Sequence, residues 1–156
     1  MNQSIDQRLH SLGIVLPSTS NPVASYIPFI QCGALLFISG QLPIWNGTLH
    51  YLGQIGDGLS LEDGQAAARL CALNILAQVK TACHNDLDRV VRCLKLGGFI
   101  NARSDFQDHP KVMDGASGLM IDVFQAHGYH TRVAVGVSSL PKGVSVEVDA
   151  LFEITF

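Results

Sequence analysis

The feature of this sequence that most restricts its fold is a regular alternation of apolar and polar side chains near the C-terminus. Within residues 144–154, every second residue is apolar: Val144, Val146, Val148, Ala150, Phe152 and Ile154. Because successive side chains of a strand point to opposite faces, this period of two predicts a β-strand with one face in the core. A shorter alternation at 132–137, with valine at every second residue, predicts another strand.

The two predicted strands are separated by Leu140–Gly143, whose proline and glycine favour a turn, so we expect a hairpin. Aligning their valine rows puts Arg132 opposite Asp149. Ala134 then faces Glu147, and a shift of two residues puts Arg132 opposite Glu147 instead. An arginine above small residues suits a carboxylate ligand, because its planar fork donates two parallel hydrogen bonds. The alternative is a cross-strand ion pair of Arg132 with Asp149 or Glu147 on a solvated face.

The rest of the chain is predicted to mix strands with two long helices. A helix begins after Ser60, because Ser60 and Asp63 resemble a capping box. The glycine-rich stretch Ser39–Gly58 is expected to be a long loop. The other predicted elements are a short helix at Ser4–Leu12, strands at Tyr26–Gln31, Ala34–Ser39 and Arg89–Ile100, and a helix from Pro110 to Gly128. The order β-β-α-β-α-β-β predicts an α+β sandwich of one sheet packed on two helices.

The composition argues for an oligomer. Charged residues make up 15% of the 156 residues, well below the roughly 25% of an average soluble domain. Apolar residues make up 47%, and a single domain of this size has too much surface to leave that much apolar area exposed. We therefore expect a homo-oligomer.

Charge and hydropathy argue against several classes of function. Ten lysines and arginines against thirteen acidic residues give a net charge of −3 without a basic block, so we expect no nucleic-acid partner. The longest apolar runs, such as Ala34–Ile38, are far shorter than the roughly 20 residues of a membrane helix, and the N-terminus does not resemble a secretory signal. Four cysteines without CxxC spacing fit reduced, buried thiols in a cytoplasmic protein. Six scattered histidines predict no metal site.

Two segments of the chain resemble the YjgF/RidA family of reactive intermediate deaminases. Thr131–Pro141, followed by Val146–Val148, is similar to the C-terminal signature of that family and keeps its spacing from arginine to glutamate. Phe37–Pro43 is similar to the family's Ser-Gly-Gln-aliphatic-Pro motif. The resemblance covers residues 22–156, so we interpret 1–156 as one YjgF/RidA-like domain with residues 1–21 as an N-terminal extension.

The resemblance implies a chorismate-mutase-like fold and a homotrimer with its sites in clefts between subunits. It also implies an activity, the hydrolytic deamination of small reactive 2-imino acids or their enamine tautomers to 2-oxo acids and ammonia. We expect no cofactor and no metal, because a protonated imine is already electrophilic. The expected partners are a small carboxylated substrate and further copies of the chain, with no membrane.

The resemblance further implies roles for individual residues. Arg132 falls on the arginine that grips the substrate carboxylate, and Glu147 on the glutamate that helps hold the attacking water. The other implied pocket residues are Tyr26, Ser39, Gly40, Ala134 and, in the second long helix, Ser117 or its neighbour Gly115. The chain departs from the deaminases at Ala134, where they commonly have cysteine, and at Ser117, where they have asparagine. The loop Trp45–Leu59 is also longer than theirs.

Other hypotheses stay open at this point. A carboxylate-binding trimer without catalysis, in a sensing or protein-protective role, needs only Arg132, whereas a deaminase also needs Glu147. Hydrolase or lyase chemistry on another small carboxylated molecule is a third possibility, and the acidic chain disfavours the ribonuclease activity of some family members. We expect Glu147, near an arginine, to keep a normal or lowered pKa unless desolvation dominates. His130, two residues before Arg132, is a candidate to border the cleft.

Overall fold

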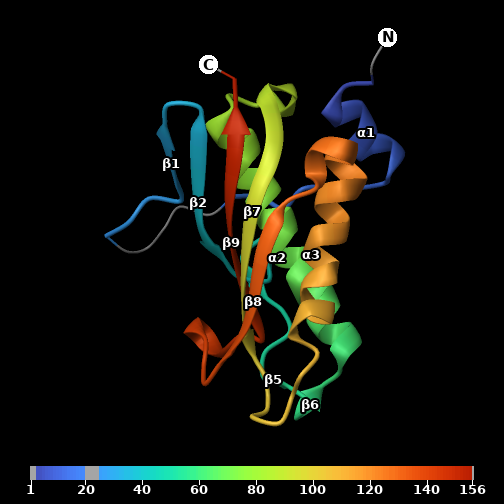
Figure 1. The fold of residues 1–156 in the computed structure, drawn as a ribbon, viewed down its shortest axis with the longest axis vertical. Coiled ribbons are helices and arrows are strands. Elements are labelled where there is room, and N and C mark those ends of the chain that lie inside the picture. The colour runs from blue at the N-terminus through green and yellow to red at the C-terminus, as the bar shows by residue number, and fades with distance from the viewer. Residues whose placement is uncertain (1–2, 20–24, 156) are drawn as a thin grey trace.

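The computed structural model describes residues 3–19 and 25–155. Its main element is a five-stranded sheet in the order β1-β2-β9-β7-β8, with helices α2 and α3 on one face (Figure 1). The sheet strands are β1 (Phe29–Cys32), β2 (Leu35–Gln41), β9 (Val146–Ile154), β7 (Val90–Asn101) and β8 (Thr131–Val137). The helices are α1 (Ile5–Ser11), α2 (Leu61–Ala82) and α3 (His109–Phe124), and the loop before α2 holds β3 (Ile44–Trp45), β4 (Thr48–Leu49), β5 (Gln54–Ile55) and β6 (Gly58–Leu59). The predicted α+β sandwich is confirmed.

The predicted C-terminal hairpin is wrong. β8 pairs in parallel with β7, and Arg132 is the partner of Leu96. β9 pairs antiparallel with the other edge of β7, where Glu147 is the partner of Phe99. β7 therefore lies between the two strands that the sequence pattern brought together (Figure 1). A local period of two specifies the faces of each strand but not its neighbours, and the connection through Pro141–Gly143 carries the chain past β7.

The observed pairing puts Arg132 and Glu147 on opposite faces of the sheet. Paired residues of neighbouring strands point to the same face, and Leu96, the partner of Arg132, is fully buried under the helices. Phe99 lies three positions after Leu96 in β7, and so it points to the other face together with its partner Glu147. The common face predicted by aligning the valine rows does not exist.

The helix-covered face of the sheet forms the hydrophobic core. Alternate residues of β9 are 0–7% exposed on this face, as the sequence pattern predicted. α2 starts at the predicted capping box, in which the Asp63 N–H donates to Ser60 Oγ at 3.1 Å and the Ser60 N–H donates to Asp63 Oδ2 at 2.9 Å. α2 and α3 approach closely at Gly115, where a β-carbon would collide with the carbonyl of Gln65. Both long helices therefore cover the same apolar face of the sheet and pack against each other there.

Some element boundaries differ from the prediction. α3 ends at Phe124 rather than at Gly128, because Gln125 has a φ of 54° and a 3₁₀ turn follows at Gln125–Gly128. β2 extends beyond Ser39 to Gln41, with a register shift against β9. Among the helices in the described part of the chain, none has the length and apolar character needed to cross a bilayer.

Candidate functional site

Arg132 lies on the edge strand β8 with its side chain against α3. Its Nη1 atom donates to Asp114 Oδ1 at 2.9 Å and to Ser117 Oγ at 3.1 Å. Nη1 donates both of these hydrogen bonds, so the two partners leave Nε and Nη2 unoccupied. The fork formed by Nε and Nη2 can bind a carboxylate with two parallel hydrogen bonds. The alternative of a cross-strand ion pair with Asp149 or Glu147 is wrong, because Arg132 pairs with the helix instead.

Ser117 is the α3 residue that meets Arg132, whereas Gly115 faces α2. Ser117 Oγ also lies 2.9 Å from Nε2 of His130, whose Nδ1 lies 2.6 Å from the carbonyl oxygen of Gly128. His130 is thus linked to Arg132 through Ser117. We call Asp114, Ser117, His130 and Arg132 the Arg132 cluster.

Glu147 belongs to a second group, on the sheet face without helices. It lies against Gly40, where a β-carbon would collide with Glu147 Oε1. Burial raises the pKa of Glu147, and the neighbouring Asp149 carboxylate raises it further. Burial also raises the pKa of Asp149, although Lys95 opposes this effect. Desolvation therefore dominates at Glu147, which is the exception that the sequence prediction allowed, and Arg132 lies on the other face of the sheet rather than beside Glu147.

The predicted pocket residues Tyr26 and Ser39 lie on the β2 side of the sheet, away from Arg132. Ser39 Oγ donates to the Ile27 carbonyl at 2.7 Å, which fastens the segment next to Tyr26 to β2. Tyr26 is 56% exposed. β9 and β7 separate β2 from β8, a distance of roughly 14 Å at the usual spacing of strands. One chain therefore divides the predicted site residues between two places.

Ala134 stays with Arg132. It lies two residues further along β8 on the same face, beside Gly98 of β7, and packs against the core. Its side chain supplies no thiol. Burial raises the pKa of the buried thiols Cys71, Cys83 and Cys93, that of Cys93 to about 12.

Cys32 differs from the other three cysteines because it is exposed at the end of β1, so the expectation that all four thiols are buried is wrong for it. The turn that follows β1 leaves this end of the edge strand uncovered. Across residues 3–19 and 25–155, no three histidine, cysteine or carboxylate side chains come together as a possible metal site.

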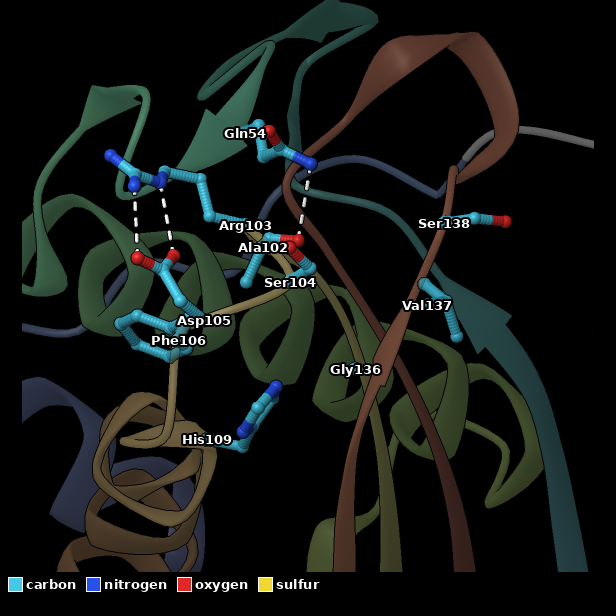
Figure 2. Close-up of a pocket in the computed structure, with 10 residues that line it drawn as sticks. All are labelled: Gln54, Ala102, Arg103, Ser104, Asp105, Phe106, His109, Gly136, Val137 and Ser138. Atoms are coloured by element: carbon cyan, nitrogen blue, oxygen red, sulfur yellow. Dashed lines mark hydrogen bonds and ion pairs between the residues drawn. The ribbon is translucent and has the colours of Figure 1, made fainter.

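A cavity of about 830 Å³ lies at the carboxyl ends of β7 and β8, where no sequence pattern predicted one (Figure 2). The ring of His109 faces this cavity. The ring of Phe106 packs edge-on against the His109 ring, with the two centroids 5.1 Å apart. Gly136 makes room for the ring, because a β-carbon there would lie 2.6 Å from His109 Nε2. Arg103 is held by Asp105 through hydrogen bonds of 3.0 and 2.9 Å. A sequence signal for this cavity was the row of small residues on β8 that ends in Gly136.

Comparison with known proteins identifies the family. A family model described as "YjgF/chorismate mutase-like, putative endoribonuclease" matches residues 6–153. The chain belongs to the YjgF/RidA family. Protein TCP17 of Trypanosoma cruzi is 44% identical over 147 residues, covering 94% of this chain and 91% of that protein. RutC family protein y4sK of Sinorhizobium fredii is 32% identical over 133 residues, covering 85% of this chain and 90% of that protein.

Solved structures of YjgF/RidA relatives share the fold. Protein Atu1372 from Agrobacterium tumefaciens has a TM-score of 0.90 at 43% identity and covers 97% of this chain and 94% of its own. A protein of Shewanella oneidensis MR-1 described as "a putative endoribonuclease" has a TM-score of 0.94 at 34% identity and covers 97% of this chain and 100% of its own. E. coli TdcF with bound serine is more distant, with a TM-score of 0.59 at 25% identity and coverage of 90% and 94%. The sheet-on-helices architecture is therefore that of the YjgF/RidA family.

Proposed function

We propose that this protein hydrolyses small 2-imino acids, or their enamine tautomers, to 2-oxo acids and ammonia in a homotrimer whose sites each use two subunits. The observation that carries the proposal is the division of the family residues between the two faces of the sheet. Arg132 and Ser117 of one chain cannot meet Glu147 and Gly40 of the same chain around one small ligand. A cleft between subunits, as the family resemblance implies, would join Arg132 of one copy to Glu147 of the next.

The open face of the sheet supports assembly. It carries Leu35, Phe37, Val133 and Val135, which are 37–44% exposed in the single chain. Exposed apolar side chains on a sheet face without helices are typical of a surface that another subunit covers. The charge-poor composition of the chain agrees with that role.

The chemistry needs two positioned groups. Arg132 binds the substrate carboxylate through Nε and Nη2, so that the imine carbon lies one bond away from a fixed point. Glu147 of the neighbouring subunit holds a water and takes its proton while the C–O bond forms and the C=N electron pair moves to nitrogen. Glu147 then returns that proton to the nitrogen, which leaves as ammonia. Serine, the ligand in the TdcF structure, resembles these substrates in size and in its carboxylate.

In the test, a catalytic amount of threonine dehydratase releases imine from threonine, and semicarbazide traps the free imine. Trapped imine and released 2-oxobutanoate are both measured. Wild-type protein should suppress trapping and speed 2-oxobutanoate release, and Arg132→Ala should not. Arg103→Ala is the matched control. Arg103 is also an exposed arginine held by an aspartate, but it lines the cavity at the carboxyl ends of β7 and β8. The proposal would be overturned if wild-type protein did not suppress trapping of imines with several different side chains. It would also be overturned if Arg132→Ala and Arg103→Ala lost activity equally.

A second candidate is a trimer that binds carboxylated metabolites without turning them over. The observation in its favour is that the Arg132 cluster is complete within one chain and needs no Glu147. It predicts that wild type binds 2-oxobutanoate without suppressing trapping, and that Glu147→Gln binds equally well. A deaminase instead loses turnover in Glu147→Gln.

RNA cleavage is the activity named in the description of the family model and of the Shewanella relative. A net charge of −3 disfavours it, because RNA binding depends on neutralising phosphates with lysine and arginine. Asp149 and Glu153 add further negative charge to the face that carries Glu147. We therefore retain the imine deaminase as the principal proposal.

A further inference from the structure

A chain of hydrogen bonds connects Arg132 to a histidine that the proposed reaction does not use. His130 Nδ1 lies 2.6 Å from the carbonyl oxygen of Gly128, and a carbonyl has no proton to donate, so Nδ1 carries the hydrogen. In the neutral ring Nε2 is then unprotonated, and it lies 2.9 Å from Ser117 Oγ. The backbone carbonyl thus fixes the tautomer in which His130 accepts a proton from Ser117.

Ser117 is arranged to pass a proton along. Its single hydroxyl hydrogen points to His130 Nε2, and one lone pair of its oxygen accepts the hydrogen bond from Arg132 Nη1 at 3.1 Å. The second lone pair remains for a donor beside Arg132. Ser117 and His130 are both only partly buried.

Imine hydrolysis supplies such a donor, because both protons of the attacking water must leave its oxygen before that oxygen becomes a carbonyl. In the proposed function Glu147 takes the first proton and gives it to the nitrogen. The second proton leaves when the carbinolamine collapses, as the C–N bond breaks with its electron pair on nitrogen and the O–H electron pair forms C=O. This step needs an acceptor near the carboxylate that Arg132 holds.

We propose that Ser117 and His130 form a proton relay that accepts this second proton; the inference rests on the proposed function. The carbinol hydroxyl gives its proton to Ser117 Oγ while Ser117 gives its own to His130 Nε2. The resulting imidazolium then protonates the departing ammonia, so a protonated imine and water become a 2-oxo acid and ammonium with charge conserved. Ser117 touches the reacting atoms, and His130 acts through it.

A purely structural role of the same two residues makes a different prediction. If Ser117 and His130 only hold Arg132 in place, their loss weakens carboxylate binding and slows turnover in parallel. If they form the relay, turnover falls while carboxylate binding is preserved, because Asp114 still holds the guanidinium. The two roles therefore separate in a comparison of kcat with ligand affinity.

The experiment uses the full chain and measures kcat by semicarbazide competition and 2-oxobutanoate binding by calorimetry. His130→Ala and Ser117→Ala should each lower kcat about 100-fold, within the usual range for general acid–base groups, with affinity nearly unchanged. Ser117→Thr keeps the hydroxyl and should recover most of the kcat that Ser117→Ala loses. His127→Ala is the matched control, because His127 is an exposed histidine three residues before His130, in the preceding 3₁₀ turn. Added imidazole should restore activity to His130→Ala but not to Ser117→Ala.

The outcomes separate the two levels of the hypothesis. Wild type without deaminase activity would overturn the proposed function and the relay together. An active wild type with an unchanged kcat in His130→Ala would overturn the relay alone, as would a parallel loss of kcat and affinity without imidazole rescue. Nitrogen NMR of wild type adds a readout independent of activity and of variant folding, and a neutral His130 protonated on Nε2 would also overturn the relay.

Discussion

The two faces of the five-stranded sheet differ in what completes them. The face under α2 and α3 is closed, and alternate residues of β9 are 0–7% exposed there. The opposite face leaves apolar side chains 37–44% exposed beside Glu147 and Asp149. Each face carries part of the residue set that the family resemblance implied. The difference shows that one chain completes its own core but divides its candidate site.

Electrostatics follows the same division. At the edge of the closed face, Arg132 is paired with Asp114. On the open face, Glu147 and Asp149 are neighbours, and burial raises the pKa of both carboxyl groups. A cation brought by another subunit would therefore have its largest effect on the open face.

The largest expected effect is on folding stability, in a comparison of two neighbouring residues of β9 that point to opposite faces of the sheet. Phe152 is fully buried and stacks edge-on with Phe124, so Phe152→Ala should lower the free energy of unfolding by about 3–5 kcal/mol. Leu151→Ala should instead weaken the oligomer with a smaller loss of folding stability. Urea denaturation and sedimentation measure the two effects. Similar unfolding losses with an unchanged oligomer would contradict the contrast between the faces.

Mixed trimers test whether the site combines the two faces across subunits. Arg132→Ala and Glu147→Gln should each lose nearly all deaminase activity, since each lacks one half of every site. Unfolding and refolding the two variants together should restore about one quarter of wild-type activity, because random mixing in a cyclic trimer gives an intact pair at that frequency. The double variant refolded alone is the control. No recovery above the separate variants would argue against a two-subunit site.

Gly40→Ala tests the contact between β2 and Glu147. The new β-carbon would displace the Glu147 carboxylate, which is the flexible end of a side chain, so the stability cost should be small. Turnover should fall about tenfold, because general acid–base catalysis depends on the position of the carboxylate. Gly118→Ala is the control, because a β-carbon at Gly118 meets open space. Equal activity in both variants would remove Glu147 from the mechanism.

The smallest expected effect is the pH dependence of Glu147. Its pKa is raised in the folded chain, so the folded chain binds the proton more tightly than the unfolded chain does, and protonation stabilises the fold. That stabilisation is full below the ordinary value of 4.5 and is lost as the pH rises through the raised pKa. Glu147→Gln should therefore be more stable than wild type near neutral pH, by less than about 1 kcal/mol for this partly exposed group, and equal to it in acid. Urea unfolding across this range measures the difference, and the opposite sign would mean that the Arg132 guanidinium of a neighbouring subunit in the proposed two-subunit site outweighs the effect of burial at Glu147.

Local sequence patterns predicted the individual elements of this fold well. The alternation in β9 and the capping box of α2 each depend on residues close together in the chain, and both were found in the structure. The resemblance also led to Arg132 and to Ser117, which meet through a hydrogen bond of 3.1 Å. These features could be predicted because turns, caps and face patterns are set by neighbours within a few residues.

The tertiary structure alone decided which faces those residues share. A period of two sorts the side chains of one strand into two rows, but it does not say which row meets the core or which strand lies alongside. The valines of β8 turned to the open face, and β7 lies between β8 and β9. The separation of Arg132 from Glu147, and the meeting of Ser117 with His130, follow from this long-range packing and not from any spacing in the sequence.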